Sequence, residues 1–123
     1  MADHRIPYVA TASIGFPNDL IMKVKKAKEM PGGFRYIHVQ GPCAPGWRIA
    51  ENKVVEIARL AVECGIWLLY EVEDGQTKIT HKPTTRKTVK EYLLKQGRFS
   101  HLTEEDFRTI QTLVDRQCES YNF

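Results

Sequence analysis

The three cysteines of this chain, Cys43, Cys64 and Cys118, are the residues best suited to redox or metal chemistry. Cys43 lies within Gly41-Pro42-Cys43-Ala44-Pro45-Gly46-Trp47, a stretch that two prolines and two glycines keep out of helix interiors and central strands. A thiol on such a rigid loop can reach a metal ion or a cluster. Free cysteines are also common as inert, buried apolar side chains, and the residues alone leave the two interpretations of Cys43 about even.

The other two cysteines differ from Cys43 in their surroundings. Cys64 ends one helical pattern and Cys118 lies near the end of another, so we expect both to be structural. An odd number of cysteines without a close-spaced pair fits a reducing compartment better than a disulfide framework. The sequence shows no glycine-rich phosphate loop, zinc spacing or acidic magnesium-diphosphate signature, so the residues alone identify no reaction.

Composition limits the class of protein. The 123 residues are 42% hydrophobic and 27% charged, which is typical of one modest globular core. A net charge of +3 is too small to indicate a nucleic-acid partner. No apolar run approaches the roughly 20 residues of a membrane-spanning helix, and no signal-peptide core follows the first residues. We therefore expect a cytoplasmic protein with neither a membrane nor a nucleic acid as partner.

The elements around Cys43 form a strand-helix-strand pattern. Residues 8–14 and 34–40 are short runs of β-forming residues, and a helix is predicted from Pro17 to just before Pro31. A right-handed crossover would make the two strands parallel. Cys43 would then follow the carboxyl end of the second strand, where α/β proteins bind ligands.

Several side chains of this unit have two interpretations. The predicted helix carries four lysines, Lys23, Lys25, Lys26 and Lys28. These lysines could dock an acidic protein such as a small electron carrier, but a solvated helix face is the favoured interpretation. His38 could be a ligand or a base, but a packed, hydrogen-bonded histidine is favoured.

The strand-helix-strand unit is incomplete by itself. Parallel strands are normally flanked by further strands and covered by helices on both faces, which two strands and one helix cannot achieve. The remainder of the sequence offers no parallel neighbour. We therefore expect the strands at residues 8–14 and 34–40 to lack partners, and an additional region upstream to complete the sheet.

The second half of the sequence predicts a different architecture. A helix is predicted over residues 54–62, with Gly65 as its C-terminal cap. Residues 66–72 and 77–81 flank Asp74-Gly75, a dipeptide favoured in tight antiparallel hairpins. Trp67 and Tyr70 could form a ligand-stacking face, but core aromatics are favoured in this short apolar strand.

The sequence of the C-terminal third predicts a connector followed by two helices. Residues 82–87 are polar and basic, as in an exposed connector. A short helix follows, which Gly97 can end, and Thr103 caps a last helix with Leu102 placed to pack on Phe107. We expect an α/β protein with residues 1–47 as one unit and residues 48–123 as a second.

Motifs along the whole chain resemble those of the β subunit of pyruvate:ferredoxin oxidoreductase, also called pyruvate synthase. The resemblance is to the C-terminal part of that subunit. The motifs are Pro7-Tyr8-Val9-Ala10-Thr11-Ala12-Ser13-Ile14-Gly15-Phe16-Pro17, Tyr36-Ile37-His38-Val39, Pro42-Cys43-Ala44-Pro45-Gly46-Trp47, Ala58-Arg59-Leu60-Ala61-Val62-Glu63, Gly65-Ile66-Trp67, Lys87-Thr88-Val89-Lys90-Glu91-Tyr92-Leu93, Gln96-Gly97-Arg98-Phe99 and His101-Leu102-Thr103.

The resemblance implies a fold and a reaction. Residues 1–47 would be the terminal strand-helix-strand of a three-layer thiamine diphosphate-binding domain with its cluster loop, followed by a helix, a hairpin and helices in residues 48–123. The full complex would decarboxylate pyruvate oxidatively with coenzyme A, giving acetyl-CoA and CO2 and reducing ferredoxin. Its cofactors would be thiamine diphosphate with Mg2+ and a four-iron four-sulfur cluster, and its partners the rest of the β subunit and α, γ and δ-type subunits.

The resemblance also implies a role for Cys43. It matches the fourth cysteine ligand of the subunit's proximal four-iron four-sulfur cluster, and Pro42, Gly46 and Trp47 would hold the loop and exclude water. The other three ligands and the magnesium-diphosphate signature have no counterpart in this sequence. We therefore expect no catalytic residue and no thiamine contact on this chain, with Thr11 and Ser13 at most peripheral, and neither cofactor binding nor activity in the chain alone.

Two alternatives remain open at this point. A sister enzyme acting on branched-chain 2-oxo acids would share nearly all these motifs. A free-standing, non-catalytic small α/β interaction protein could retain the fold without the chemistry. Substrate assays on a full complex would distinguish the branched-chain enzyme from pyruvate synthase. A chain that is a stable monomer without metal would indicate the interaction protein.

Overall fold

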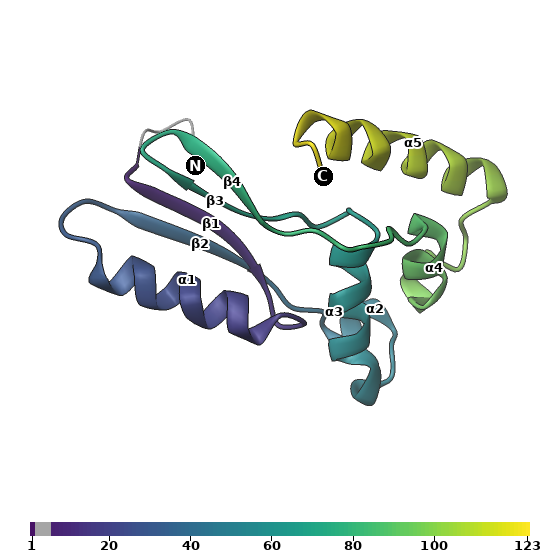
Figure 1. Ribbon diagram of the computed structural model, residues 1–123. Helices are drawn as coiled ribbons and strands as arrows, with labels where there is room; N and C mark the ends of the chain where they lie inside the picture. Colours follow the sequence, from purple (N-terminus) through teal and green to yellow (C-terminus); the bar gives the residue numbers. More distant parts are fainter. Residues whose placement is uncertain (2–5) are drawn as a thin grey trace.

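The computed structural model describes residue 1 and residues 6–123. Four strands form one mixed sheet in the order β2-β1-β3-β4 (Figure 1). The strands are β1 (Tyr8–Ser13), β2 (Arg35–Gln40), β3 (Leu69–Glu73) and β4 (Gln76–His81). The predicted α/β class is confirmed.

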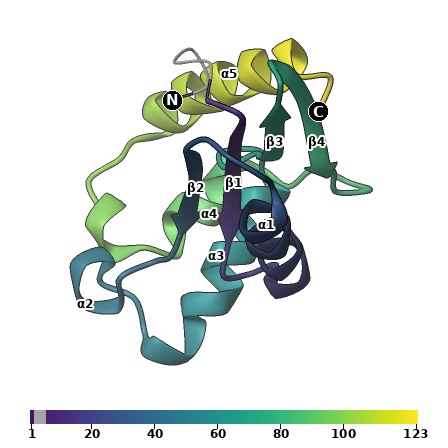
Figure 2. The same cartoon turned by 90° about the vertical axis from the view of Figure 1, so that its left-hand side faces the viewer.

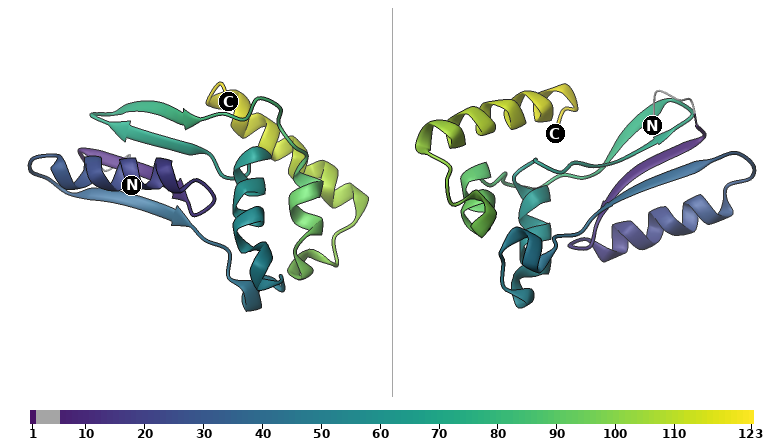
Figure 3. Two further views of the ribbon diagram at one scale, coloured as in Figure 1. Left: turned by 60° about the horizontal axis from the view of Figure 1, so that its bottom comes forward. Right: turned by 180° about the vertical axis from the view of Figure 1, so that it is seen from behind.

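The predicted strand-helix-strand unit is also confirmed. Helix α1 (Pro17–Glu29) connects β1 to β2, and the two strands pair in parallel from Tyr8 opposite Arg35 to Ser13 opposite Gln40. Pro17 begins α1, where its missing N–H needs no partner, and Asp19 complements the positive end of the helix. The helix lies along one face of the sheet (Figure 3).

The prediction that both strands lack neighbours is wrong for β1. The hairpin returns to β1 in antiparallel register, with Glu73 opposite Tyr8 and Glu71 opposite Ala10, so β1 is a central strand and all six of its residues are buried. A hairpin strand can extend a parallel pair because one strand edge accepts a neighbour in either direction. The free edges of the sheet belong to β2 and β4.

The hairpin turn is confirmed, but the first hairpin strand begins later than predicted. Asp74 and Gly75 have φ values of 48° and 78°, as a two-residue hairpin turn requires. Strand β3 begins at Leu69 because the Trp67 N–H donates to the Ala61 carbonyl at 3.0 Å, which holds this part of the chain against the preceding helix.

A group of helices lies beyond one end of the sheet, with α5 across the top of the group (Figures 1 and 2). The helical elements after β2 are α2 (Ala44–Trp47), η2 (Glu51–Lys53), α3 (Val54–Glu63), α4 (Val89–Leu94), η3 (Gly97–Phe99) and α5 (Glu104–Ser120). Their buried residues form the main hydrophobic core, to which α3, α4 and α5 contribute Ile57, Leu60, Tyr92, Phe107 and Val114. The division of the chain at residues 47 and 48 stays a prediction, although the sheet joins strands from both sides.

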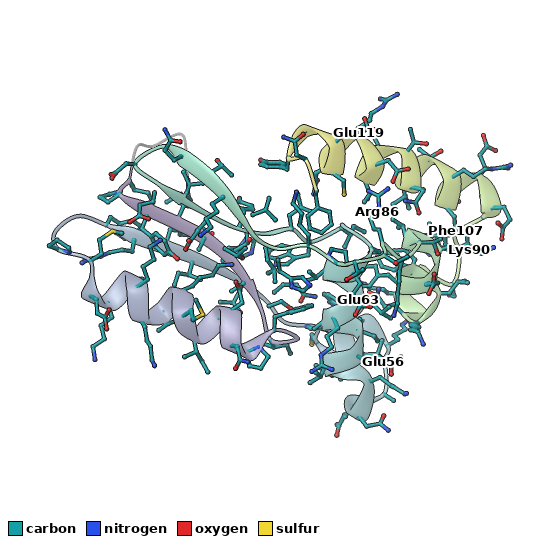
Figure 4. All side chains as sticks on the ribbon, viewed as in Figure 1. Glu56, Glu63, Arg86, Lys90, Phe107 and Glu119 are labelled. Carbon is teal, nitrogen blue, oxygen red and sulfur yellow. The ribbon has the colours of Figure 1, made fainter. Side chains whose placement is uncertain are left out.

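Caps and ion pairs fix the ends of these helices. Thr103 is the N-cap of α5, as the sequence predicted. It forms a reciprocal capping box with Asp106. Gly65 follows α3 with φ 83°, as predicted for its C-terminal cap. Arg86 pairs with Asp115 of α5, and Figure 4 shows Arg86 between α5 and the helices below it.

In the described part of the chain, no helix combines the length and apolar character needed to cross a membrane.

Candidate functional site

Cys43 differs from the other cysteines in its exposure. Its side chain is exposed, whereas Cys64 and Cys118 are buried. The interpretation of Cys43 as a buried core residue is therefore wrong, and the structural interpretation fits the other two. Burial also raises the pKa of the Cys64 thiol to about 11, which keeps it protonated and unreactive at neutral pH.

The loop that carries Cys43 contains a helical turn that the sequence did not predict. The Trp47 N–H donates to the Cys43 carbonyl at 2.9 Å, and the Ile49 N–H donates to the Ala44 carbonyl at 3.0 Å. Pro45 is tolerated because it lies in the first turn, where its missing N–H has no intrahelical partner. The turn ends at Arg48, whose φ is 53°. These bonds hold the backbone on both sides of the thiol.

Gly46 leaves space beside the Cys43 sulfur. A Cβ built on Gly46 would lie 3.3 Å from the Cys43 Sγ, closer than side-chain atoms normally approach. The preceding Pro42 is buried. Because Gly46 has no side chain, the exposed Cys43 sulfur can lie close to the turn that follows it.

Two residues that the sequence reasoning missed contact this loop from the C-terminal segment. The Gly97 N–H donates to the Arg48 carbonyl at 3.2 Å, and the Arg98 guanidinium carbon lies 3.7 Å from the centroid of the Trp47 ring. In the sequence, Gly97 was predicted only to end the short helix before it, and Arg98 was noted only within the Gln96-Gly97-Arg98-Phe99 motif of the resemblance. Trp47, half-buried, is thus packed against a cation as well as against the core.

Thr11 and Ser13 have structural partners. The Thr11 hydroxyl donates to the Leu68 carbonyl at 2.6 Å and accepts the Tyr70 N–H at 3.0 Å. The Ser13 hydroxyl donates to Gln40 Oε1 at 2.8 Å and accepts the Gly15 N–H at 3.2 Å. Both side chains are buried and hydrogen-bond β1 to its neighbours.

The aromatic residues near the end of the sheet contact one another and the backbone. Trp67 is half-buried and donates its indole N–H to the Ala12 carbonyl at 3.0 Å. Its ring lies 4.8 Å from the exposed His38 ring, edge to face, and Tyr70 stacks on Tyr121. These contacts agree with the favoured interpretation of Trp67 and Tyr70 as packed aromatic residues. The expectation of a packed His38 is met by this contact with Trp67, although His38 is exposed on the edge strand β2. No side-chain hydrogen bond of His38 is present among the described residues.

The lysines of α1 do not form one solvated face. Lys23 is 2% exposed and donates to Asp19, to Thr80 and to the Thr11 carbonyl. Its loss of hydration lowers its pKa. Lys26 pairs with Glu71 and Glu73 across a cleft of about 810 Å3 between α1 and the hairpin, and its hydrogen bond to Glu73 raises its pKa.

Lys25 and Lys28 are exposed, as expected of a solvated face. The prediction for the helix was therefore wrong at Lys23, because helical spacing turns that position toward the sheet.

Comparison with known proteins relates the whole chain to one group of subunits. No model of a known protein family matches the chain. The chain is 54% identical to "Pyruvate synthase subunit PorB" of Methanothermobacter thermautotrophicus over 119 residues, which cover 97% of the chain and 41% of the relative. The chain is similar to this PorB subunit along nearly its whole length. It is also 51% identical to PorB of Methanocaldococcus jannaschii, over 97% of the chain and 40% of that relative.

A second kind of subunit is related at lower identity. "Ketoisovalerate oxidoreductase subunit VorB" of Pyrococcus furiosus is 44% identical over 94% of the chain and 38% of the relative. The chain thus spans about two fifths of the length of the curated relatives it matches, and it corresponds to the C-terminal part of the PorB subunits.

Cys43 is the candidate for a metal ligand among the cysteines that the structure describes, because its side chain is exposed. Among residue 1 and residues 6–123, no three His, Cys, Asp or Glu side chains come together as a metal-binding group. A four-iron four-sulfur cluster needs several cysteine thiolates. The exposed Cys43 sulfur fits the requirement for one of them.

Proposed function

We propose that this chain forms the C-terminal part of the β subunit of a pyruvate synthase, that is, a pyruvate:ferredoxin oxidoreductase. The complex would decarboxylate pyruvate oxidatively with coenzyme A, producing acetyl-CoA and CO2 and reducing ferredoxin, and could run in reverse. The observation that carries the proposal is the 54% identity to a PorB subunit over 97% of the chain. The chain by itself would be inactive, because it spans only part of its relatives.

We assign Cys43 the role of a cluster ligand. When bound, a four-iron four-sulfur cluster carries single electrons away from the reacting centre. Cys43 would hold one iron through its thiolate, while Pro42 and the turn ending at Arg48 orient the sulfur. Trp47 would shield the loop from water. Support comes from the exposure of Cys43, the hydrogen-bonded turn that follows it, and the close approach of the sulfur to Gly46.

The proposed partners follow from the same assignment. They are the rest of the β subunit, the α, γ and δ-type subunits, and ferredoxin as electron acceptor. The chain has uncovered surface for such contacts, since Ile21, Val24 and Val39 are between 43% and 50% exposed and β2 has a free edge.

A branched-chain 2-oxo acid is the alternative substrate. The VorB relatives are 43% to 44% identical to the chain, against 48% to 54% for four PorB subunits and 42% for PorB of Thermotoga maritima. The four higher identities favour pyruvate. Rates with pyruvate and with 2-oxoisovalerate on the purified complex decide between the two substrates.

The assignment of Cys43 is tested by replacing it in the complete complex. Cys43→Ala should lower the iron content, change the low-temperature EPR spectrum of the reduced enzyme and slow ferredoxin reduction, with the thiamine site largely intact. Cys64→Ala and Cys118→Ala are matched controls, since both thiols are buried away from the loop and should act only through packing. If Cys43→Ala kept the wild-type iron, spectrum and rate, Cys43 would be a structural cysteine.

The location of the thiamine site is tested on the chain alone. We expect no magnesium-dependent binding of thiamine diphosphate in a calorimetric titration, because Thr11 and Ser13 are already engaged and no acidic metal-binding group occurs among the described residues. Measurable binding would show that part of the cofactor site lies on this chain.

A further inference from the structure

Helix α1 covers only one face of the sheet. Tyr8 lies on that face, because the Lys26 ammonium of α1 lies 5.3 Å from the centre of its ring. Successive side chains of a strand point to opposite faces, so Thr11 lies on the second face, with His38 of β2 opposite it in the register. Among the described residues, no helix runs along this second face, since α3, α4 and α5 lie beyond the end of the strands (Figure 3).

Five aromatic side chains gather on the second face and at its end, and we call them the aromatic face. They are Tyr36, His38, Trp67, Tyr70 and Tyr121. Ring centroids are 6.3 Å apart for Tyr36 and His38, 4.8 Å for His38 and Trp67, and 5.9 Å for Tyr70 and Tyr121. All five are partly or fully exposed, and a contiguous exposed patch of this kind is typical of an interaction surface.

A hollow of about 300 Å3 lies between the aromatic face and the C-terminal end of α5. Trp67 and Tyr70 line the hollow on one side, and Gln117 and Tyr121 line it on the other. None of its lining residues in the described part of the chain is Asp, Glu, Lys or Arg. A charged group that entered the hollow would lose hydration without gaining an opposite charge. The hollow therefore fits an uncharged, apolar side chain.

The kind of partner that fits this surface is a helix. Parallel strands such as β1 and β2 are normally covered by helices on both faces, and the described residues supply such a helix on one face only. The chain spans about two fifths of the length of its curated relatives, and 41% of one of them. The remainder of a subunit of that length is long enough to supply the second covering helix.

We propose that the aromatic face is the docking surface for a helix from the part of the β subunit that this chain does not contain. An uncharged apolar side chain of that helix would fill the hollow between Trp67 and Tyr121. The proposal rests on the proposed function, in which this chain is the C-terminal part of a β subunit. It concerns a different surface from the free edge of β2, which would accept a strand rather than a helix.

Acylation of His38 by diethyl pyrocarbonate measures this cover, since His38 is exposed on the aromatic face. The samples are the chain alone, the complete β subunit and the whole complex at neutral pH, with labelled peptides quantified by mass spectrometry. His38 should react in the chain alone and at least about tenfold more slowly in the complete β subunit, where reaction requires local opening of the interface. His101, exposed and outside the aromatic face, is the matched control and should react equally in both.

Photo-crosslinking in the complete complex identifies the occupant. p-Benzoylphenylalanine in place of Tyr121 should form a link to a peptide of the same β subunit that lies outside this chain. A link to a different subunit, or no link, would refute the proposed docking. Protection of His38 that appears only in the whole complex would assign the face to another subunit and refute it as well. If the β subunit is insoluble without its partners, the crosslink decides.

A charge at the rim of the hollow tests the character of the occupant. Gln117→Glu should speed the labelling of His38 in the complete β subunit, because a charge buried without a partner opposes docking. Thr112→Glu, exposed on α5 and outside the hollow, is the matched control and should leave the rate unchanged. An unchanged rate in Gln117→Glu would refute an uncharged occupant.

Pyruvate-dependent reduction of ferredoxin by the same complex separates this proposal from the proposed function. An active complex in which His38 reacts as quickly as in the chain alone would refute the docking helix and leave the proposed function standing. An inactive complex in which His38 is protected and Tyr121 is linked within the β subunit would overturn the proposed function and support the docking surface.

Discussion

The ammonium group of Lys23 donates a hydrogen bond of 2.8 Å to the backbone carbonyl of Thr11 in the central strand. The same ammonium contacts Asp19 and the Thr80 hydroxyl, each at 2.7 Å, so one buried cation links α1 to two strands. A buried charge is tolerated only where it is paired and hydrogen-bonded, and all three donors of Lys23 have acceptors here.

Replacing Lys23 should destabilise the chain markedly. Lys23→Met keeps the apolar stem but leaves Asp19 without its cation, and we expect the free energy of unfolding to fall by about 2 kcal/mol. Urea unfolding followed by circular dichroism measures the change. Lys25→Met, at an exposed position two residues away, is the matched control and should change stability by less than about 0.5 kcal/mol. Equal effects of the two substitutions would contradict the buried network.

Thiol reactivity should separate the three cysteines. In the folded chain at pH 8, iodoacetamide should label Cys43 and leave Cys64 and Cys118 unmodified, because those two are covered. Mass spectrometry of proteolytic peptides identifies the labelled residue, with a denatured sample as the control in which all three react. Rapid labelling of Cys64 at pH 8 would disprove its burial.

The raised pKa of Cys64 also predicts a pH dependence of stability. Between the ordinary thiol pKa of 9.0 and the folded value of about 11, the unfolded chain has released this proton and the folded chain has kept it. Stability should therefore fall as pH rises through this interval. Cys64→Ala should remove this contribution, and an unchanged slope in that variant would contradict it.

Hydrogen exchange should rank the strands by their position in the sheet. Amides of β1 should be strongly protected because β1 is buried between two neighbours, whereas amides on the free edge of β2 should exchange quickly. If β1 exchanged as quickly as β2, the hairpin would not be paired with β1 in solution.

The free edge of β2 should also cause self-association of the isolated chain. Val39 lies on this edge strand with 43% of its side chain exposed. Val39→Lys should increase the monomer fraction in sedimentation velocity. Leu113→Lys replaces an apolar residue of α5 that is even more exposed, at 58%, and should leave the distribution unchanged. A wild-type chain that is monomeric at high concentration would refute the prediction.

Gly65 should tolerate no side chain. Its φ is 83°, and a Cβ would lie 2.4 Å from the Cys118 sulfur. Gly75 has a similar φ of 78° but open space around it, so Gly75→Ala isolates the backbone strain. We expect Gly75→Ala to lower the free energy of unfolding by about 1 kcal/mol and Gly65→Ala by about 3 kcal/mol, as measured by urea unfolding. Similar losses at the two positions would show that the Cys118 contact is unimportant.

The sequence by itself determined the local structure. Pro17 and the spacing of apolar residues placed α1, Asp74-Gly75 placed the hairpin turn, and Thr103 placed the start of α5. Each of these signals acts through the dihedral preferences and hydrogen bonds of a few neighbouring residues, which are the same in any tertiary setting. The Cys43 loop was singled out in the same way, by its prolines and glycines.

Only the tertiary structure decided which of these pieces meet. The pairing of Tyr8 with Glu73, the burial of Lys23 and the stacking of Arg98 on Trp47 join residues that are distant in sequence or turn toward other elements. No local pattern encodes such contacts, because they depend on which apolar surfaces and free strand edges come together during folding. The sequence neighbours of Cys43 show that it is an unusual cysteine. The contact of Arg98 with Trp47 in the turn after Cys43 comes only from the packing of the C-terminal segment.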